Sequence, residues 1–239
     1  MGRLRHDMHE EEKRALEEMI SERREIPANT KVIERGQTCN TSTLLIDGFM
    51  LRTIEAGDRR YVVSFHVPGD FVDMHCFTLK RLDHNIVTVG PATIGQVSHQ
   101  AVYDTMDNRT HLARLFWFST LLDAAMHREW IMKLEQLTAN RRIAHIFCEI
   151  WTRLEMVGLG RPDGFDTPLT QADIADMCGS TTIHANRAIG ELRKLEVVDF
   201  RRGKVRVPDR EKLFRFAHFS ADYLYGSGTL SLEREGGPG

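Results

Sequence analysis

Histidine and cysteine side chains are the first candidates for chemistry in this sequence. His66, His75 and His84 recur at nine-residue intervals, and imidazoles on neighbouring strands can converge on a metal ion. No acidic partner accompanies them, so edge or turn positions are the more common role. The four cysteines are far apart and form no CxxC pair, which favours buried free thiols over zinc, disulfide or iron–sulfur chemistry. No catalytic motif occurs. We therefore assign no metal site, no cofactor and no enzymatic activity.

Basic side chains gather in one part of the chain, which is the second chemical signal. The whole protein has 239 residues and a formal charge of -2. Residues 181–215 contain ten basic and five acidic side chains, a net charge of +5, so the rest carries -7. A local positive field of this kind is typical of a nucleic-acid contact, whereas a charge run with no partner is the plainer alternative.

The elements around this basic stretch predict a helix-turn-helix with a wing. Thr170 can cap a helix over 171–177, and Gly179 supplies the turn. A second helix, capped by Ser180 or Thr181, is expected to run to about Lys194. The runs 197–200 and 205–208 flank a basic tip and predict a β-hairpin, and a last helix is expected over 209–225.

Two apolar helices precede this unit. Apolar residues recur with helical spacing from about Asn108 to Leu137, and again over 139–156. The first helix is too long and too apolar to bury itself on one small β domain, so we expect one face to pack on a second copy of the chain. A fully buried central helix of a monomer is the alternative. The expected dimer contacts are Leu115, Phe118, Leu122, Met126, Trp130, Leu134 and Leu137.

The first half of the chain has a different pattern of residue types. Residues 7–24 predict a charged acidic helix. From about Val32 to Val102, short β-prone runs alternate with turn residues such as Asp47-Gly48, a pattern typical of a small sandwich or barrel.

With these elements in place, the sequence resembles the Crp/Fnr superfamily of bacterial transcription regulators over about residues 26–225. The motifs that carry the resemblance are the segment 169–177, the segment 180–193 and, more weakly, Pro68-Gly69-Asp70-Phe71. The resemblance implies an α+β fold with an N-terminal antiparallel β-roll that is cyclic-nucleotide-binding-like, a long dimerisation helix and a C-terminal winged helix-turn-helix. We expect the sensor domain with its helix (108–137) over 1–137, the DNA-binding domain over 138–225, and a disordered tail over 226–239.

The resemblance also implies a homodimer that binds double-stranded DNA at a two-fold operator. Arg187 falls where the family places an arginine on a guanine, with a phosphate contact or an ion pair with Glu191 as alternatives. Thr182 and Ile183 replace the Arg-Glu pair of the cyclic-AMP receptors, so their operator sequence is not carried over. The residues assigned to the DNA interface are Ser180, Thr181, Thr182, His184, Asn186, Arg187, Arg201, Arg202 and Lys204.

The resemblance does not identify an effector. Candidate pocket residues are Gly69, Asp70, Arg81 and His84, but Asp83 would repel a cyclic phosphate, which argues against cyclic AMP. Other expected properties are a cytoplasmic location, no membrane span and contact with RNA polymerase. A cupin-like metal-binding enzyme or metal sensor fused to a winged helix is the alternative function. Activation or repression, operator sequence and regulated genes are not encoded in any pattern that we recognise.

Overall fold

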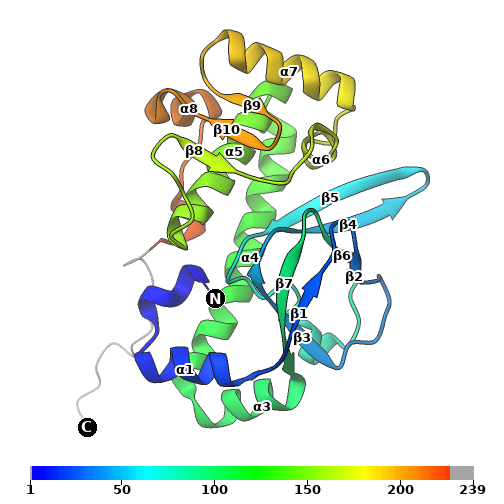
Figure 1. Ribbon diagram of the computed structural model, residues 1–239, viewed down its shortest axis with the longest axis vertical. Helices are drawn as coiled ribbons and strands as arrows, with labels where there is room; N and C mark the ends of the chain where they lie inside the picture. Colours follow the sequence, from blue (N-terminus) through cyan, green and yellow to red (C-terminus); the bar gives the residue numbers. More distant parts are fainter. Residues whose placement is uncertain (1, 227–239) are drawn as a thin grey trace.

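A computed structural model describes residues 2–226, with the side chain of residue 3 excepted. A β-rich half and a helical half lie at opposite ends of the molecule, and one long helix, α4, runs between them (Figure 1). The N-terminal helices pack beside the β-rich half. The expected tail over 226–239 lies almost wholly outside the described residues.

The N-terminal segment departs from the predicted helix over 7–24. It forms a 3₁₀ turn, η1 (Gly2–Asp7), a helix, α1 (Glu10–Glu18), and a strand, β1 (Ile20–Ile26). The strand pairs antiparallel with β7; Ile26 is buried and Ile20 partly buried, and the five side chains between them are exposed. A strand with so little burial shows no alternation of apolar and polar residues, so its charged sequence resembles that of a surface helix.

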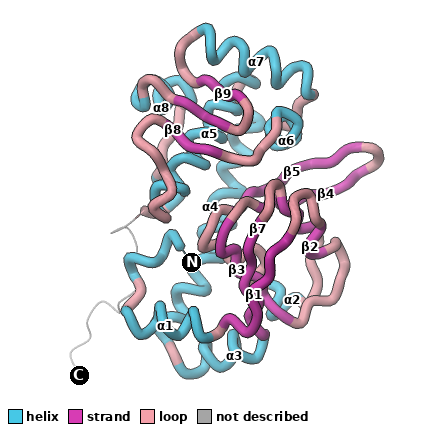
Figure 2. Tube along the Cα trace, viewed as in Figure 1, coloured by secondary structure: helices cyan, strands magenta, loops and turns pink. Residues whose placement is uncertain are grey.

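Two antiparallel sheets form the β-roll, as expected from the strand-rich texture (Figure 2). One has the order β1-β7-β3, and the other has the order β2-β6-β4-β5. The strands are β2 (Lys31–Ile33), β3 (Thr41–Asp47), β4 (Met50–Ala56), β5 (Arg59–His66), β6 (Asn85–Thr88) and β7 (Ala92–Ser98), with a short helix α2 (Cys76–Leu79). The Asp47-Gly48 turn connects the two sheets, and Gly48 has a φ of +91° beside the backbone of Pro91.

Three helices follow the β-roll: α3 (His99–Asn108), α4 (Thr110–Gln136) and α5 (Ala139–Met156). The predicted helix over 108–137 matches α4 closely, and α5 has the predicted bounds. Helix α3 was not predicted, because its first residues continue the apolar texture of β7. Ser98 starts it by accepting a hydrogen bond from the Ala101 backbone at 3.1 Å.

Helix α4 buries most of the residues that were predicted to form a dimer contact. Leu115, Leu122, Met126 and Trp130 are buried within their own chain, so the prediction is wrong for these four. The β-roll and α5 supply enough apolar surface to cover this face, which the sequence did not indicate. Phe118 and Leu137 are half-buried. The exposed apolar side chains of α4 are Trp117, Leu121, Ile131, Met132 and Leu134.

The C-terminal half contains the predicted helix-turn-helix and wing, with one further strand. Helices α6 (Gln171–Met177) and α7 (Thr182–Lys194) have the predicted extents. Strands β9 (Asp199–Arg201) and β10 (Lys204–Arg206) form the hairpin, and β8 (Gly164–Asp166), for which no element was predicted, pairs with β10. Helix α8 (Arg210–Ala217) ends earlier than predicted, since His218 is left-handed, and η2 (Asp222–Leu224) follows.

A single apolar cluster crosses the boundary predicted between residues 137 and 138. It contains Phe65 and Val67 of the roll, Trp130 of α4, Ile146 of α5 and Ile174 of α6. The fully buried Arg153 of α5 strengthens this junction. Its guanidinium donates to the Phe65 carbonyl at 3.1 Å and to the Asp70 carboxylate at 2.5 Å. The β-roll and the helical half therefore share this cluster, while two further apolar clusters lie within residues 4–122.

Candidate DNA-binding interface

Two capped helices and a tight turn build the candidate interface. The Thr170 hydroxyl accepts a hydrogen bond from the Asp173 backbone at 3.1 Å, and Asp173 in turn accepts from the Thr170 backbone at 2.8 Å. Gly179, with a φ of +61°, makes the turn. The Thr181 hydroxyl accepts from the His184 backbone at 3.3 Å and so starts α7. This local chemistry fixes the angle at which α7 leaves the domain.

One face of α7 packs into the domain, and the other is left in solvent. Ala185, Ala188, Ile189 and Leu192 are buried. The predicted interface residues of the first two turns are all exposed, namely Thr181, Thr182, His184, Asn186 and Arg187. Ser180 of the turn is half-buried. The first turn of α7 has no acidic side chain, so the positive end of the helix dipole faces outward uncompensated.

Arg187 does not form the ion pair with Glu191 that the sequence left open. Glu191 instead accepts a hydrogen bond from Asn140 at 3.3 Å. Within residues 2–226, no hydrogen bond or ion pair involves the Arg187 guanidinium. Its fork of donors is therefore available to an external acceptor.

The wing carries three exposed cations beside α7. Arg201, Arg202 and Lys204 are all exposed, and Arg202 and Gly203 form the hairpin tip with positive φ values. Arg201 and Arg193 both donate to Asp199, at 3.1 and 2.7 Å. The carboxylate of Asp199 consequently has its pKa lowered by the two guanidinium groups despite some burial. Arg202 and Lys204 are thus the freer cations of the tip.

A groove of about 570 Å³ lies along the N-terminal end of α7. Its walls include Thr181, His184 and Arg187 of the helix-turn-helix, Asn140 of α5 and Arg59 of the β4–β5 hairpin. The hairpin also contacts α6 directly, since Arg60 donates to Asp173 at 2.6 Å and to Asp176 at 2.8 Å. The sensor half therefore contributes cations right beside the candidate DNA-contacting surface.

The predicted effector residues do not form one pocket. Asp70 is buried and bonded to Arg153, and Gly69 packs against Gly2, whose backbone N–H donates to the Gly69 carbonyl at 2.7 Å. Arg81 is exposed, and His84 bonds to Asp83 at 2.7 Å. Gly69, Asp70 and His84 therefore take part in separate intramolecular contacts, and the Arg81 side chain is exposed.

The space between the β-roll and α4 is also too small for a nucleotide. It measures about 30 Å³ and is lined by charged and polar groups, among them Arg52, His66, His75 and Asp123. Small-molecule pockets usually measure about 300–1,000 Å³. Arg52 and Asp123 form an ion pair across it. Burial lowers the pKa of both His66 and His75 to about 4, so both imidazoles are neutral at neutral pH.

The alternative metal site at the three spaced histidines is not supported by their geometry. His66 faces Asp70, while His75 and His84 lie with ring centroids 5.8 Å apart. Among the described residues, one different group of three meets the geometry for a metal, namely His9, Glu12 and His111. All four cysteines are buried as free thiols, as predicted.

Comparison with known proteins decides the family. A family model described as a Crp-like helix-turn-helix domain matches residues 141–216. A probable transcriptional activator of Rhizobium leguminosarum bv. viciae is 28% identical over 198 residues, covering 81% of this chain and 80% of that protein. The transcriptional activator protein FnrL of Cereibacter sphaeroides is 27% identical over 194 residues, covering 78% and 76%. The chain is a transcription regulator of the Crp/Fnr type.

Solved structures show the same fold for this Crp/Fnr regulator. FixK2 from Bradyrhizobium japonicum superimposes with a TM-score of 0.75 at 17% identity, covering 84% of this chain and 98% of that one. The expected α+β fold is confirmed, and the cupin-like alternative is not favoured. No described helix of the regulator is long and apolar enough to span a bilayer.

Several residues with a place at the interface were missed by the sequence analysis. Ile183 was not assigned to the interface, but its side chain is 73% exposed. Arg59 and Arg60 lie more than 100 positions from α7, and no local pattern connects them. Ile183 was findable in principle, because it breaks the apolar spacing set by Ala185, Ile189 and Leu192.

Proposed function

We propose that this regulator binds a two-fold operator as a homodimer and that α7 enters the major groove. The observation that carries the proposal is the exposed face of α7, where Arg187 is unpaired within the described residues and the helix dipole is uncompensated. Arg187 would donate to O6 and N7 of a guanine, a contact worth about 1–3 kcal/mol in discrimination. Asn186 and His184 are further candidates for base contacts.

Other side chains of the interface suit contacts that position the protein on DNA. Ser180, Thr181, Arg201, Arg202 and Lys204 would bind phosphates on either side of the groove. Thr182 and the exposed Ile183 present methyl groups, which suit the C5-methyl of thymine. Binding to phosphates releases counterions, so operator affinity should fall as salt rises.

The homodimer would form through the exposed apolar side of α4. Ile131 is 69% exposed and Trp117 is 63% exposed. Exposed apolar side chains that gather on one element of a folded protein are typical of a contact with a partner. RNA polymerase is the natural second partner of a DNA-bound transcription regulator, and the protein would act in the cytoplasm without catalysing a reaction. A cyclic nucleotide would not bind between the roll and α4, because the space there measures only about 30 Å³.

Selection of bound sequences from a random DNA pool tests the proposal. We expect enrichment of a two-fold symmetric motif whose half-sites lie about 34 Å apart, one helical turn. A double variant, Asn186→Ala with Arg187→Ala, is the control that should fail to enrich the motif. Enrichment of the same motif by the double variant, or of an asymmetric sequence by the wild type, would overturn it. Repeating the selection with cell extract detects an effector.

A further inference from the structure

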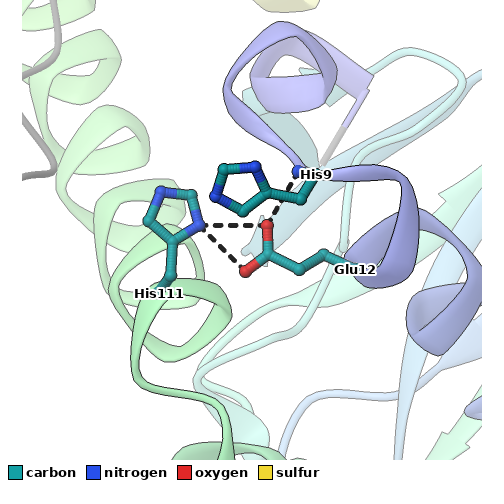
Figure 3. A group of neighbouring side chains, drawn as sticks. All are labelled: His9, Glu12 and His111. Carbon is teal, nitrogen blue, oxygen red and sulfur yellow. Dashed lines mark hydrogen bonds and ion pairs between the residues drawn. The ribbon is translucent and has the colours of Figure 1, made fainter.

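A cluster of two histidines and one glutamate lies where the N-terminal helix meets the long helix (Figure 3). His9 immediately precedes α1, and Glu12 is in its first turn. His111 is in the first turn of α4. The His111 Nδ1 atom lies 2.9 and 3.0 Å from the two carboxylate oxygens of Glu12. The His9 ring faces the His111 ring with a centroid distance of 4.8 Å.

Glu12 is the unusual member of this cluster. It is only 7% exposed, yet no ion pair with a lysine or arginine neutralises it among the described residues. Its carboxylate accepts from the His9 backbone at 2.9 Å and from His111. A buried carboxylate is costly unless a cation or several donors compensate it. The nearby Lys13 does not fill this role, because it pairs with Glu10 at 2.6 Å.

The donor set matches the preferences of first-row transition metals. Two imidazoles with one carboxylate are the protein ligands of zinc and non-haem iron sites that keep a position open, whereas calcium and magnesium prefer oxygen ligands. One donor atom from each residue lies within 4.8 Å of the others. Bonds of about 2.0–2.1 Å at tetrahedral angles separate ligand atoms by about 3.3 Å. Small rotations of the exposed His9 ring would close this difference.

We propose that His9, Glu12 and His111 bind one divalent transition-metal ion, with water at the fourth position. The metal would take the place of the proton on His111 Nδ1, and the neutral imidazole would carry its proton on Nε2 instead. The ion would join α1 to the first turn of α4 and neutralise the buried carboxylate. This site lies outside the DNA interface, so the proposal does not rest on the proposed function.

Zinc binding to the full-length protein tests the proposal. Equilibrium dialysis against a chelator-buffered Zn²⁺ series should give one ion per chain. Glu12→Gln and His111→Ala should each weaken binding at least tenfold, while His127→Ala, a change at another α4 histidine outside the cluster, should leave it unchanged. Co²⁺ should give the visible absorption bands of a four-coordinate site in the wild type, and these bands should be lost in Glu12→Gln.

Thermal unfolding separates the metal site from a purely structural contact. Each variant is first unfolded without metal, so that any general loss of stability is known. Saturating Zn²⁺ should raise the unfolding midpoint of the wild type and of His127→Ala, but not of Glu12→Gln. Equal zinc affinity in all four proteins would overturn the proposal. So would variants that lose stability without metal while the wild type binds no zinc.

Discussion

Arg187 illustrates how much a single side chain depends on what its neighbours leave free. The sequence offers Glu191 as an ion-pair partner at i+4, and such pairs are common on helices. In the structure Asn140 at the start of α5 donates to Glu191, so tertiary packing withdraws that partner. Among the described residues, the Arg187 guanidinium therefore has no intramolecular partner.

Arg187→Ala should relax sequence preference at one base pair in each half-site. Loss of a two-pronged contact to guanine removes about 1–3 kcal/mol of discrimination at that position. Competition binding against operators mutated at each position measures the effect. Arg202→Ala is the matched control and should weaken binding evenly across sequences. An even loss for Arg187→Ala would instead make it a phosphate contact.

Asp73 gives a pH-dependent prediction in the β-roll. Burial raises its pKa to about 7, although a hydrogen bond from the Thr43 backbone lowers it. The folded state thus keeps a proton that the unfolded chain releases near the ordinary aspartate pKa of 3.8. Since the folded state binds more protons between these values, the contribution of Asp73 to stability is full below about pH 4 and is lost as pH rises to about 7.

Asp73→Asn should remove this dependence, because the amide does not titrate. The stability of the wild type relative to the variant should fall by up to about 4 kcal/mol between pH 4 and pH 8. Urea unfolding of both proteins at the two pH values measures it, and other titrating groups cancel in the comparison. A difference that stays constant with pH would refute the raised pKa.

At the level of residues, the sequence revealed the groups that share a short segment but missed the groups that meet by folding. Thr181 to Arg187 share one exposed helical face, so helical spacing alone locates them. His9 and Glu12 precede His111 by about 100 positions, and only the packing of α1 on α4 brings them together. Arg153, from a distant helix, likewise pairs with Asp70, which the sequence analysis had assigned to an effector pocket.

Among the elements, the β4–β5 hairpin is the one that connects the sensor half to the helix-turn-helix. Arg60 bonds to two carboxylates of α6, and Asp173 keeps its second oxygen for capping that helix. The hairpin therefore restrains α6, and through the turn it restrains α7. Removal of Arg60 should loosen the helix-turn-helix and leave the capping hydrogen bonds of α6 and α7 in place.

Arg60→Ala should weaken operator binding several-fold, because a looser helix-turn-helix loses more entropy when it docks. It should lower stability by no more than about 1 kcal/mol, since Arg60 is partly exposed. Arg35→Ala removes the same charge from an exposed loop and should leave both quantities unchanged. Fluorescence anisotropy and urea unfolding measure them. Tighter operator binding by Arg60→Ala would show that the hairpin inhibits rather than supports DNA contact.

Capped helices were predicted well, and strands without a local apolar pattern were not. Thr170 and Thr181 mark their helices with side-chain oxygens at the expected positions, so the bounds of α6 and α7 followed from local chemistry. Strands β1 and β8 depend on their partners, β7 and β10, for their existence. Their own residues carry no apolar alternation, and a glycine opens β8.

For the molecule as a whole, the exposed side of α4 makes oligomeric state the decisive measurement. Ile131→Glu places a charge at the centre of the proposed interface and should convert a dimer of twice 27.4 kDa into monomers. Sedimentation velocity measures the mass, and operator affinity should fall with it. Leu159→Glu changes an exposed leucine outside α4 and should leave the dimer intact. A dimer in both variants would place the interface elsewhere.

The core shared by the two halves limits how far this regulator can be treated as modules. Arg153 lies on the C-terminal side of the predicted boundary, but its guanidinium donates hydrogen bonds to Phe65 and Asp70 of the β-roll. Calorimetry of the full chain should therefore show one cooperative transition, and two separate transitions would contradict it. A chimera cut between residues 137 and 138 would bury an arginine without its acceptors. Exchange of DNA specificity with a relative should succeed only when α5 is transferred together with the β-roll that holds it.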